Sequence, residues 1–178
     1  MRENMEMPSL EPIFLNYAAE EPQKFTGRIE TCCGKLSADQ IWMRGSDNQN
    51  AIGNLILHLA GNVRQWILSG VGGEPDQRIR DLEFSARGGQ APADLLGNLR
   101  ATVDAACGVI RAVPHAQLTE RRIIQGHDVN LFEAILHVVE HFSGHTAQII
   151  FITKMLTGED LGFYSYLNQP QAAAGPRP

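Results

Sequence analysis

Three histidines spaced four residues apart are the feature of this sequence best suited to chemistry. His137, His141 and His145 lie in the segment from Asn130 to Leu156. On a helix they stand one turn above each other, about 6 Å apart along the axis, on one stripe. The stripe borders an apolar face and points inward, where an imidazole needs a hydrogen-bond partner or a metal ion. These histidines are therefore either satisfied core residues or a functional site.

Metal binding requires a further ligand from another part of the chain. Two histidines at four-residue spacing can reach one ion at about 2.0–2.1 Å. The outer pair, His137 and His145, is separated by about 12 Å and cannot share an ion with His141 on a straight helix. A second segment, residues 51–69, has a polar stripe beside its apolar face, formed by Asn54, His58, Asn62 and Gln65. His58 is the candidate third ligand.

The segment that contains the three histidines has marked ends. Asn130 with Glu133 forms an Asn-led capping box, and Gly158 stands where a left-handed C-cap is expected. We therefore predict a helix from about Leu131 to Thr157. Its apolar residues recur at spacings of three, four and seven, which buries one broad face: Ile135, Val138, Phe142, Ile149, Ile152 and Leu156.

Three further helices are predicted from apolar spacing. The first covers residues 9–36, with a disturbance or a second start near Pro22. The second covers residues 51–69, capped by Asn48 or Asn50 and closed by Gly70. The third begins near Pro92 and ends at about Val113, before Pro114.

The connecting segments are predicted to be irregular. Residues 37–50 form a polar connection whose Trp42 packs back on the helices. Residues 71–90 are rich in glycine and charge and suit a crossover or a lip over a site. We interpret the charged residues of this segment as solvated or paired with each other: Arg78, Arg80, Asp81 and Glu83. Residues 125–128 form a turn, His115 and His127 are exposed, and the aromatic segment 159–167 folds back on the helices.

Composition limits the classes of function. The 178 residues suit one domain, residues 9–167, with flexible termini at 1–8 and 168–178. The net charge of −5 argues against a nucleic-acid partner. No run approaches the roughly 20 apolar residues of a membrane span, which predicts a soluble, cytoplasmic protein. The cysteines, Cys32, Cys33 and Cys107, are odd in number and lack metal-site spacing, so we expect reduced thiols.

Four helices without a convincing strand predict an all-α fold, a four-helix bundle with a long connection between its second and third helices. In such a bundle, facing helices build metal sites in the core. The middle of the second helix then faces the middle of the fourth, and His58 meets the histidines of that helix.

Three stretches resemble the DinB-like or YfiT-like metalloenzymes, in particular a subgroup of uncharacterised bacterial proteins. They are NLILHLAGNVRQWI (54–67), RIRDLEF (78–84) and HVVEHFSGHTAQI (137–149), and the resemblance covers about residues 10–165. It implies a divalent ion (Ni, Zn or Fe) held by His58, His141 and His145, with water in the open positions. It also implies a supporting role for His137. The subgroup usually has glycine where this chain has Ala147, which adds a methyl group near the site.

The resemblance further implies an activity and an assembly. Better-understood relatives use a low-molecular-weight thiol, such as bacillithiol or mycothiol, in S-transfer or isomerisation, and often form homodimers. We therefore expect a metal-dependent thiol transferase or hydrolase acting on a small electrophilic substrate. The alternatives are a non-catalytic, stress-related bundle that binds a metal or ligand, and a purely structural homodimer. A catalytic ion keeps an exchangeable water, whereas a structural ion is closed by four protein ligands.

Several polar residues are predicted to support the ligands. Besides His137, these are Gln148, Asn62 and Asn54, of which the first two stand one turn beyond His145 and His58. The alternative is that Gln148 and Asn62 satisfy each other across the core. Glu140 precedes His141 and is expected to be a solvated carboxylate.

Overall fold

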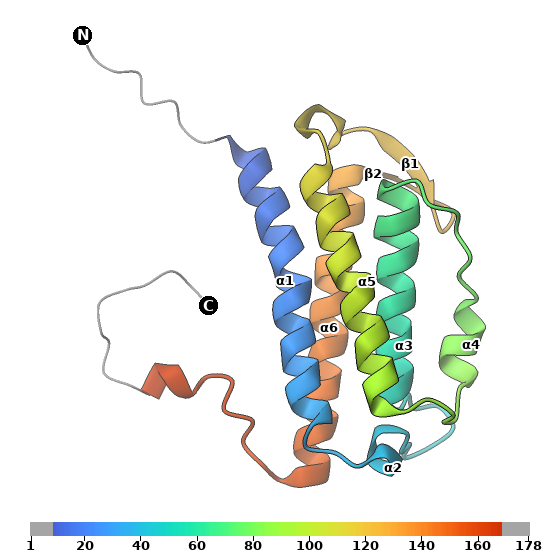
Figure 1. The fold of residues 1–178 in the computed structure, drawn as a ribbon, viewed down its shortest axis with the longest axis vertical. Helices are drawn as coiled ribbons and strands as arrows, with labels where there is room; N and C mark the ends of the chain where they lie inside the picture. Colours follow the sequence, from blue (N-terminus) through green and yellow to red (C-terminus); the bar gives the residue numbers. More distant parts are fainter. Residues whose placement is uncertain (1–8, 169–178) are drawn as a thin grey trace.

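The computed structural model describes residues 9–168, and four long helices account for most of that length. These helices lie side by side, with α1 and α3 each packed against both α5 and α6 (Figure 1). Their bounds are α1 (Leu10–Cys33), α3 (Ile52–Val63), α5 (Pro92–Ala112) and α6 (Leu131–Thr157). The chain is mostly helical, as predicted. The expectations for residues 1–8 and 169–178 lie outside the described residues.

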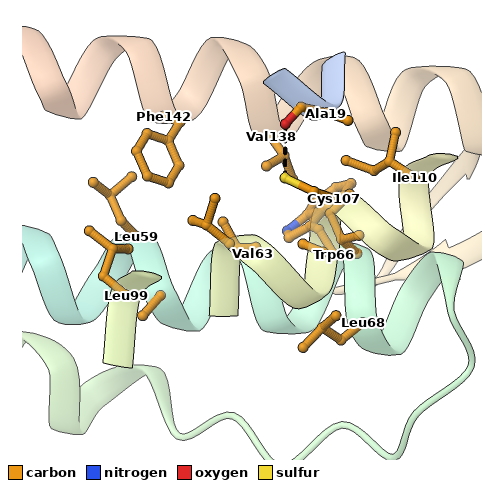
Figure 2. Close-up of a cluster of buried hydrophobic side chains, with 14 of the residues drawn as sticks. Ala19, Leu59, Val63, Trp66, Leu68, Leu99, Cys107, Ile110, Val138 and Phe142 are labelled. Carbon is orange, nitrogen blue, oxygen red and sulfur yellow. Dashed lines mark hydrogen bonds between the residues drawn. The ribbon is translucent and has the colours of Figure 1, made fainter. Parts of the chain in front are cut away.

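The interior between the helices is apolar (Figure 2). It also holds the three cysteines, Cys32, Cys33 and Cys107. Phe142 of α6 lies near Leu59 of α3, and both side chains are fully buried. The Cys107 thiol donates to the carbonyl oxygen of Ala19 at 2.8 Å. All three cysteines are free, as predicted, and burial raises the pKa of each thiol, that of Cys33 to about 12. None of them is suited to act as a nucleophile at neutral pH.

Helix α6 has the predicted bounds, Leu131–Thr157. The Asn130 side chain accepts from the backbone N–H of Glu133 at 2.8 Å, and the Glu133 carboxylate accepts from that of Asn130 at 2.8 Å. Gly158 takes the left-handed conformation, with φ 69°, and ends the helix. The three histidines of α6 therefore occupy the predicted register.

Helix α1 is continuous across Pro22, so the expected interruption does not occur. The proline removes one backbone donor, but its own carbonyl oxygen accepts a second bond, from the Thr26 hydroxyl at 2.7 Å. The helix ends at Cys33, three residues earlier than predicted.

The second predicted helix differs at both ends. Neither Asn48 nor Asn50 caps it; the backbone N–H of Ala51 donates instead to Oδ1 of Asn54 at 3.1 Å. Beyond Val63 the chain continues as a π-helix, η1 (Arg64–Val71), past the predicted end at Ser69. The capping prediction was wrong because Asn54, inside the first turn, reaches back to the helix start.

Both segments predicted to be irregular contain short helices. Helix α2 (Ala38–Ile41) carries a capping box, and the ring of Trp42 packs against Gly53 as predicted. Helix α4 (Arg80–Ser85) lies against α3 (Figure 1), and its Glu83 contacts His58 of that helix. Its packing brings side chains of the 71–90 segment into the interior.

A hairpin precedes α6, so the prediction of no strand was wrong. Strands β1 (Arg121–Ile124) and β2 (His127–Asn130) pair antiparallel, with Ile124 opposite His127. The two turn residues, Gln125 and Gly126, have φ of 53° and 81°, the conformation of a tight hairpin turn. His115, in the short 3-10 helix η2 (His115–Gln117), and His127 are exposed as predicted.

The segment after α6 folds back as predicted. The Arg28 guanidinium of α1 lies over the rings of Phe163 and Tyr164, at 5.6 and 5.5 Å from their centroids. A 3-10 helix, η3 (Ser165–Asn168), ends the described chain. Within residues 9–168, no helix has the length and apolar character needed to cross a membrane.

Candidate metal centre

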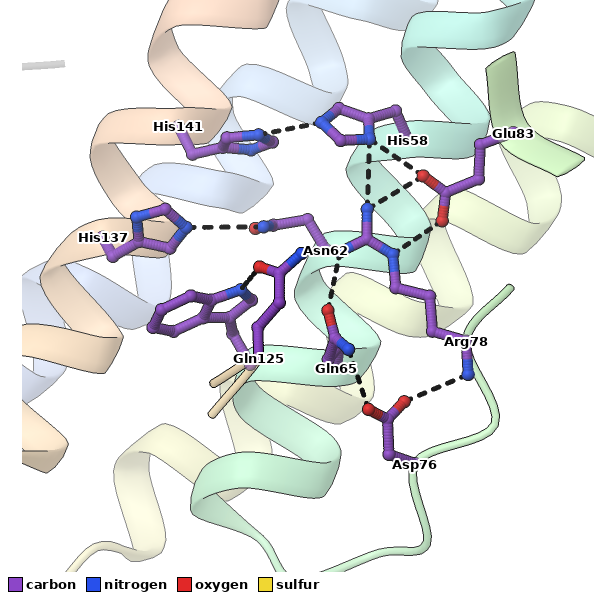
Figure 3. Close-up of polar contacts among 10 residues, drawn as sticks. His58, Asn62, Gln65, Asp76, Arg78, Glu83, Gln125, His137 and His141 are labelled. Carbon is purple, nitrogen blue, oxygen red and sulfur yellow. Dashed lines mark hydrogen bonds and ion pairs between the residues drawn. The ribbon is translucent and has the colours of Figure 1, made fainter. Parts of the chain in front are cut away.

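Three imidazoles from two helices lie close together. His58 comes from α3, and His141 and His145 come from α6. One ring nitrogen of each lies within 4.8 Å of the others, and the Nε2 atoms of His58 and His141 are 3.0 Å apart (Figure 3). Two nitrogens bound to one tetrahedral ion lie roughly 3.3 Å apart. This three-histidine group can hold a metal ion.

The orientation of His58 is fixed by Glu83 of α4. Nδ1 of His58 lies 2.8 Å from Oε2 of Glu83, and both side chains are buried. A nitrogen lone pair facing a carboxylate at this distance would be repelled. Nη2 of Arg78 lies farther from Nδ1, at 3.1 Å, and already donates to the same oxygen of Glu83, so Nδ1 carries the proton and donates it to Glu83. The lone pair of His58 is then on Nε2, which faces the histidines of α6. Metal-binding histidines are commonly oriented by a carboxylate in this way.

Glu83 is in turn held by Arg78. The guanidinium donates from Nε to Oε1 at 2.7 Å and from Nη2 to Oε2 at 2.8 Å. Burial acts to raise the pKa of Glu83, but hydrogen bonds and charge from Arg78 and His58 outweigh it, so the pKa lies below its usual range. The carboxyl group is therefore ionised at neutral pH. The charged residues of the 71–90 segment were predicted to be solvated or paired with each other. Arg78 and Glu83 are paired, and neither is solvated.

A wider polar network supports Arg78. Its Nη1 donates to Oε1 of Gln65 at 2.9 Å, and Gln65 donates to Oδ2 of Asp76 at 2.8 Å. The other Asp76 oxygen accepts from the backbone N–H of Arg78 at 3.0 Å. This network fixes the segment before α4 to the outer side of α3 and η1 (Figure 3).

The absence of a side chain at Gly61 makes room for Glu83. A Cβ atom at this position would lie 2.0 Å from Oε1 of Glu83 and 3.0 Å from Nε of Arg78. The first distance is far shorter than real contacts of a Cβ atom, and the second is tighter than most of them. The Glu83 carboxylate can reach His58 only because residue 61 is a glycine.

The two histidines that α6 contributes to the group, His141 and His145, are neutral at physiological pH. Burial, followed by the charges of the neighbouring His145 and His58, lowers the pKa of His141 to about 3, and burial also lowers the pKa of His145. Nδ1 of His145 lies 2.8 Å from Oε1 of Gln148. Because this oxygen can only accept, Nδ1 of His145 carries the proton and the lone pair of the ring is on Nε2. Nδ1 of His141 is buried and has no partner among the described residues. The residues therefore fit a metal ion, because the rings are neutral and two of them have Nε2 free to bind.

His137 lies outside the three-histidine group. Its ring packs on Trp66, with centroids 4.0 Å apart, and its Nε2 accepts from the Asn62 amide at 3.4 Å. Asn62 and Gln148 thus bond to different histidines, so the alternative that they satisfy each other is wrong.

Asn54 acts on the surrounding backbone. Its amide donates to the carbonyl oxygen of Glu83 at 2.8 Å and to that of Ala86 at 3.0 Å, which ties α4 to the start of α3. It forms no hydrogen bond with a histidine within residues 9–168. Glu140 is exposed, as predicted, and Ala147 is exposed as well.

The family of the chain follows from a match over almost its whole length. The model of a family described as a protein of unknown function, DUF1572, matches residues 11–169. The chain belongs to the DUF1572 family. DUF1572 is part of the DinB/YfiT-like superfamily, which agrees with the resemblance of the sequence motifs. No curated protein matches this DUF1572 chain significantly.

Proposed function

We propose that this DUF1572 protein is a four-helix bundle of the DinB/YfiT type that binds a divalent ion, Zn, Ni or Fe(II), through His58, His141 and His145. The ion serves an enzymatic reaction in which a thiol or a water attacks a small electrophilic substrate. The observation that carries the proposal is the orientation of the rings. Glu83 and Gln148 hold the Nδ1 atoms of His58 and His145, so their Nε2 lone pairs converge with His141.

The ligand set supports a catalytic rather than a structural ion. A divalent ion held by three neutral imidazoles supplies a Lewis acid that favours loss of a proton from a water or thiol near neutral pH. Among the described residues, no fourth histidine, cysteine or carboxylate joins the group. His141 and His145 are only partly buried, so a small molecule can approach them.

A thiol in this reaction has to come from outside the chain. Cys32, Cys33 and Cys107 are buried, and burial raises the pKa of each. None lies in the three-histidine group. A low-molecular-weight thiol, as used by better-understood members of the superfamily, fits this requirement. Glu83 is bonded to Arg78 and His58, so its role is to orient His58 and not to accept a proton from substrate.

Activity assays on the metal-loaded protein test this function. We expect the wild type to accelerate the reaction of 1-chloro-2,4-dinitrobenzene with a cellular thiol, or the hydrolysis of p-nitrophenyl acetate, only when Zn, Ni or Fe(II) is supplied. His58→Ala should lose this activity, while His115→Ala, which removes an exposed imidazole, should keep it. Turnover that is the same in His58→Ala would contradict the proposed site.

The alternative is a non-catalytic protein that binds a metal or ligand. The observation that favours this alternative is the buried Glu83 carboxylate, which holds His58 in one orientation. A ligand held in one orientation suits a structural ion as well as a catalytic one. Cobalt(II) absorption spectra distinguish the two. A spectrum that changes on addition of a small thiol indicates an open coordination position, whereas an unchanged, four-coordinate spectrum in an inactive protein supports the alternative.

A further inference from the structure

A largely apolar pocket of about 470 Å³ lies beside the candidate metal centre. Its volume is in the range of small-molecule sites. The walls come from the start of α3, the second half of α6 and the loop that precedes α3. The residues that matter for its chemistry are Arg44, Leu55, Gln148, Phe151, Ile152 and Met155.

Gln148 connects this pocket to the three-histidine group. Its side chain lines the pocket, and its Oε1 accepts from Nδ1 of His145 at 2.8 Å. Phe151 and Met155 follow on the same helix, so this apolar wall lies about 9 to about 15 Å beyond His145 along the axis. A ligand in the pocket can therefore contact Gln148, which in turn contacts the ring of a proposed metal ligand, His145.

Phe151 and Met155 are large apolar side chains that are mostly exposed to solvent. Their exposed fractions are 64% and 70%, although neighbouring Ile149 is fully buried. Leu55 and Ile152 form the deeper wall of the pocket. Binding of an apolar molecule here would cover this surface and gain the corresponding hydrophobic free energy.

The pocket also carries a positive charge that no carboxylate neutralises. Nη2 of Arg44 donates to three uncharged oxygens, Oδ1 of Asn54 at 2.6 Å and the carbonyl oxygens of Phe84 at 2.9 Å and Ala86 at 3.1 Å. Its Nε is buried without a partner in the described structure. None of the ion pairs within residues 9–168 includes Arg44.

The surroundings of Arg44 disfavour its charge but do not remove it. Burial, and then the like charge of Arg87, lower the pKa of Arg44, against a smaller opposite effect of Asp47. An arginine stays protonated at physiological pH in spite of such a shift. An anion that enters the pocket would supply the missing counter-charge and accept charge-assisted hydrogen bonds.

We propose that this pocket binds the substrate of the metal centre, and that the substrate is an amphipathic anion. Its apolar body packs on Phe151, Ile152 and Met155, and its carboxylate or similar group lies at Arg44. The assignment as substrate rests on the proposed function, whereas binding of such an anion does not require the ion.

Calorimetric titration with three eight-carbon probes tests the chemical class. Octanoate, 1-octanol and octylamine share the apolar chain but differ in charge. We expect the wild type to bind octanoate roughly tenfold more tightly than 1-octanol, and octylamine most weakly. Arg44→Gln should lower octanoate affinity to that of 1-octanol and leave 1-octanol unchanged. Arg44→Lys should retain a preference for octanoate.

A second variant tests the location without disturbing the network of Arg44. Phe151→Ala removes an exposed side chain and should weaken octanoate and 1-octanol alike, while Phe132→Ala, an exposed phenylalanine at the other end of α6, should weaken neither. Equal affinities of the wild type for all three probes, or no binding of octanoate, would overturn the proposal. Unchanged octanoate binding in both Arg44→Gln and Phe151→Ala would overturn it as well.

The test of the pocket and the test of the proposed function can fail independently. Metal binding without octanoate binding would reject the amphipathic anion and leave the metal centre intact. Octanoate binding by a wild-type protein that takes up no Zn, Ni or Fe(II) would reject the metal centre while the pocket assignment stands.

Discussion

At the scale of single residues, the candidate site depends on the buried pair that lies behind its ligands. Glu83 fixes the proton of His58 on Nδ1, Arg78 keeps Glu83 ionised, and Gly61 leaves space for both. In the sequence, spacing and the expected bundle indicated His58 and the histidines of α6 as candidates, and the resemblance to the DinB/YfiT-like proteins selected His58, His141 and His145. It could not identify Glu83, because a carboxylate 25 residues away, in a segment without periodicity, reaches His58 only through the packing of α4 on α3.

We predict that Gly61→Ala weakens metal binding without unfolding the protein. The new methyl group would lie 2.0 Å from Oε1 of Glu83, so the carboxylate must move and His58 loses its orientation. Loss of a residue that orients a ligand typically costs roughly 10- to 100-fold in metal affinity. Competition with a chromophoric chelator measures this loss. Gly108→Ala is the matched control, because a Cβ atom there meets nothing within 4 Å; equal affinities of the two variants would contradict the role of Gly61.

The burial of His141 predicts a pH dependence of the metal-free protein. Its pKa falls from 6.5, the value we take for the unfolded chain, to about 3 in the folded state. Between these values the unfolded chain binds a proton that the folded protein does not. The free energy of unfolding therefore decreases as the pH falls below about 6.5. Urea unfolding of His141→Gln should show a shallower decrease between about pH 6.5 and 5, with His115→Gln as the control; a slope equal to that of the wild type would show that His141 titrates normally.

At the scale of elements, the bounds of α6 could be predicted because residues typical of helix ends stand at both of them. Asn130, Glu133 and Gly158 defined its bounds, and the histidine register followed from them. The hairpin was missed because each strand has only four residues and its turn, Gln125-Gly126, lacks the Asn or Asp usual at the first position. The π-helical continuation of α3 was missed because apolar spacing does not distinguish it from an α-helix over eight residues.

Two Asn→Ala substitutions test how the two site-bearing helices begin. Asn130→Ala removes the side chain that caps α6, so we expect it to lower the free energy of unfolding by about 1 kcal/mol. Asn48→Ala should be close to neutral, since Asn48 does not cap α3. Urea denaturation provides both values. A larger loss in Asn48→Ala than in Asn130→Ala would contradict the capping contacts described here.

At the scale of the whole molecule, the four long helices bring together residues that are 83 positions apart in the sequence, His58 and His141. Helix α3 packs against both α6 and α4, so His58 contacts His141 of α6 through Nε2 and Glu83 of α4 through Nδ1 (Figure 3). The apolar pattern of the helices predicted this meeting of α3 and α6. The pocket at Arg44 could not be predicted, since it is formed by a loop and two helix ends that approach only in the folded chain.

The central claim is that His58, His141 and His145 hold one ion, and elemental analysis of purified variants tests it most directly. We predict one equivalent of a divalent metal in the wild type and in His115→Ala, and none in His58→Ala, His141→Ala or His145→Ala, with circular dichroism to confirm that each is folded. His137→Ala should retain most of its metal, because that ring contacts Asn62 and Trp66 instead. Equal metal content in the wild type and in folded His58→Ala would contradict the account.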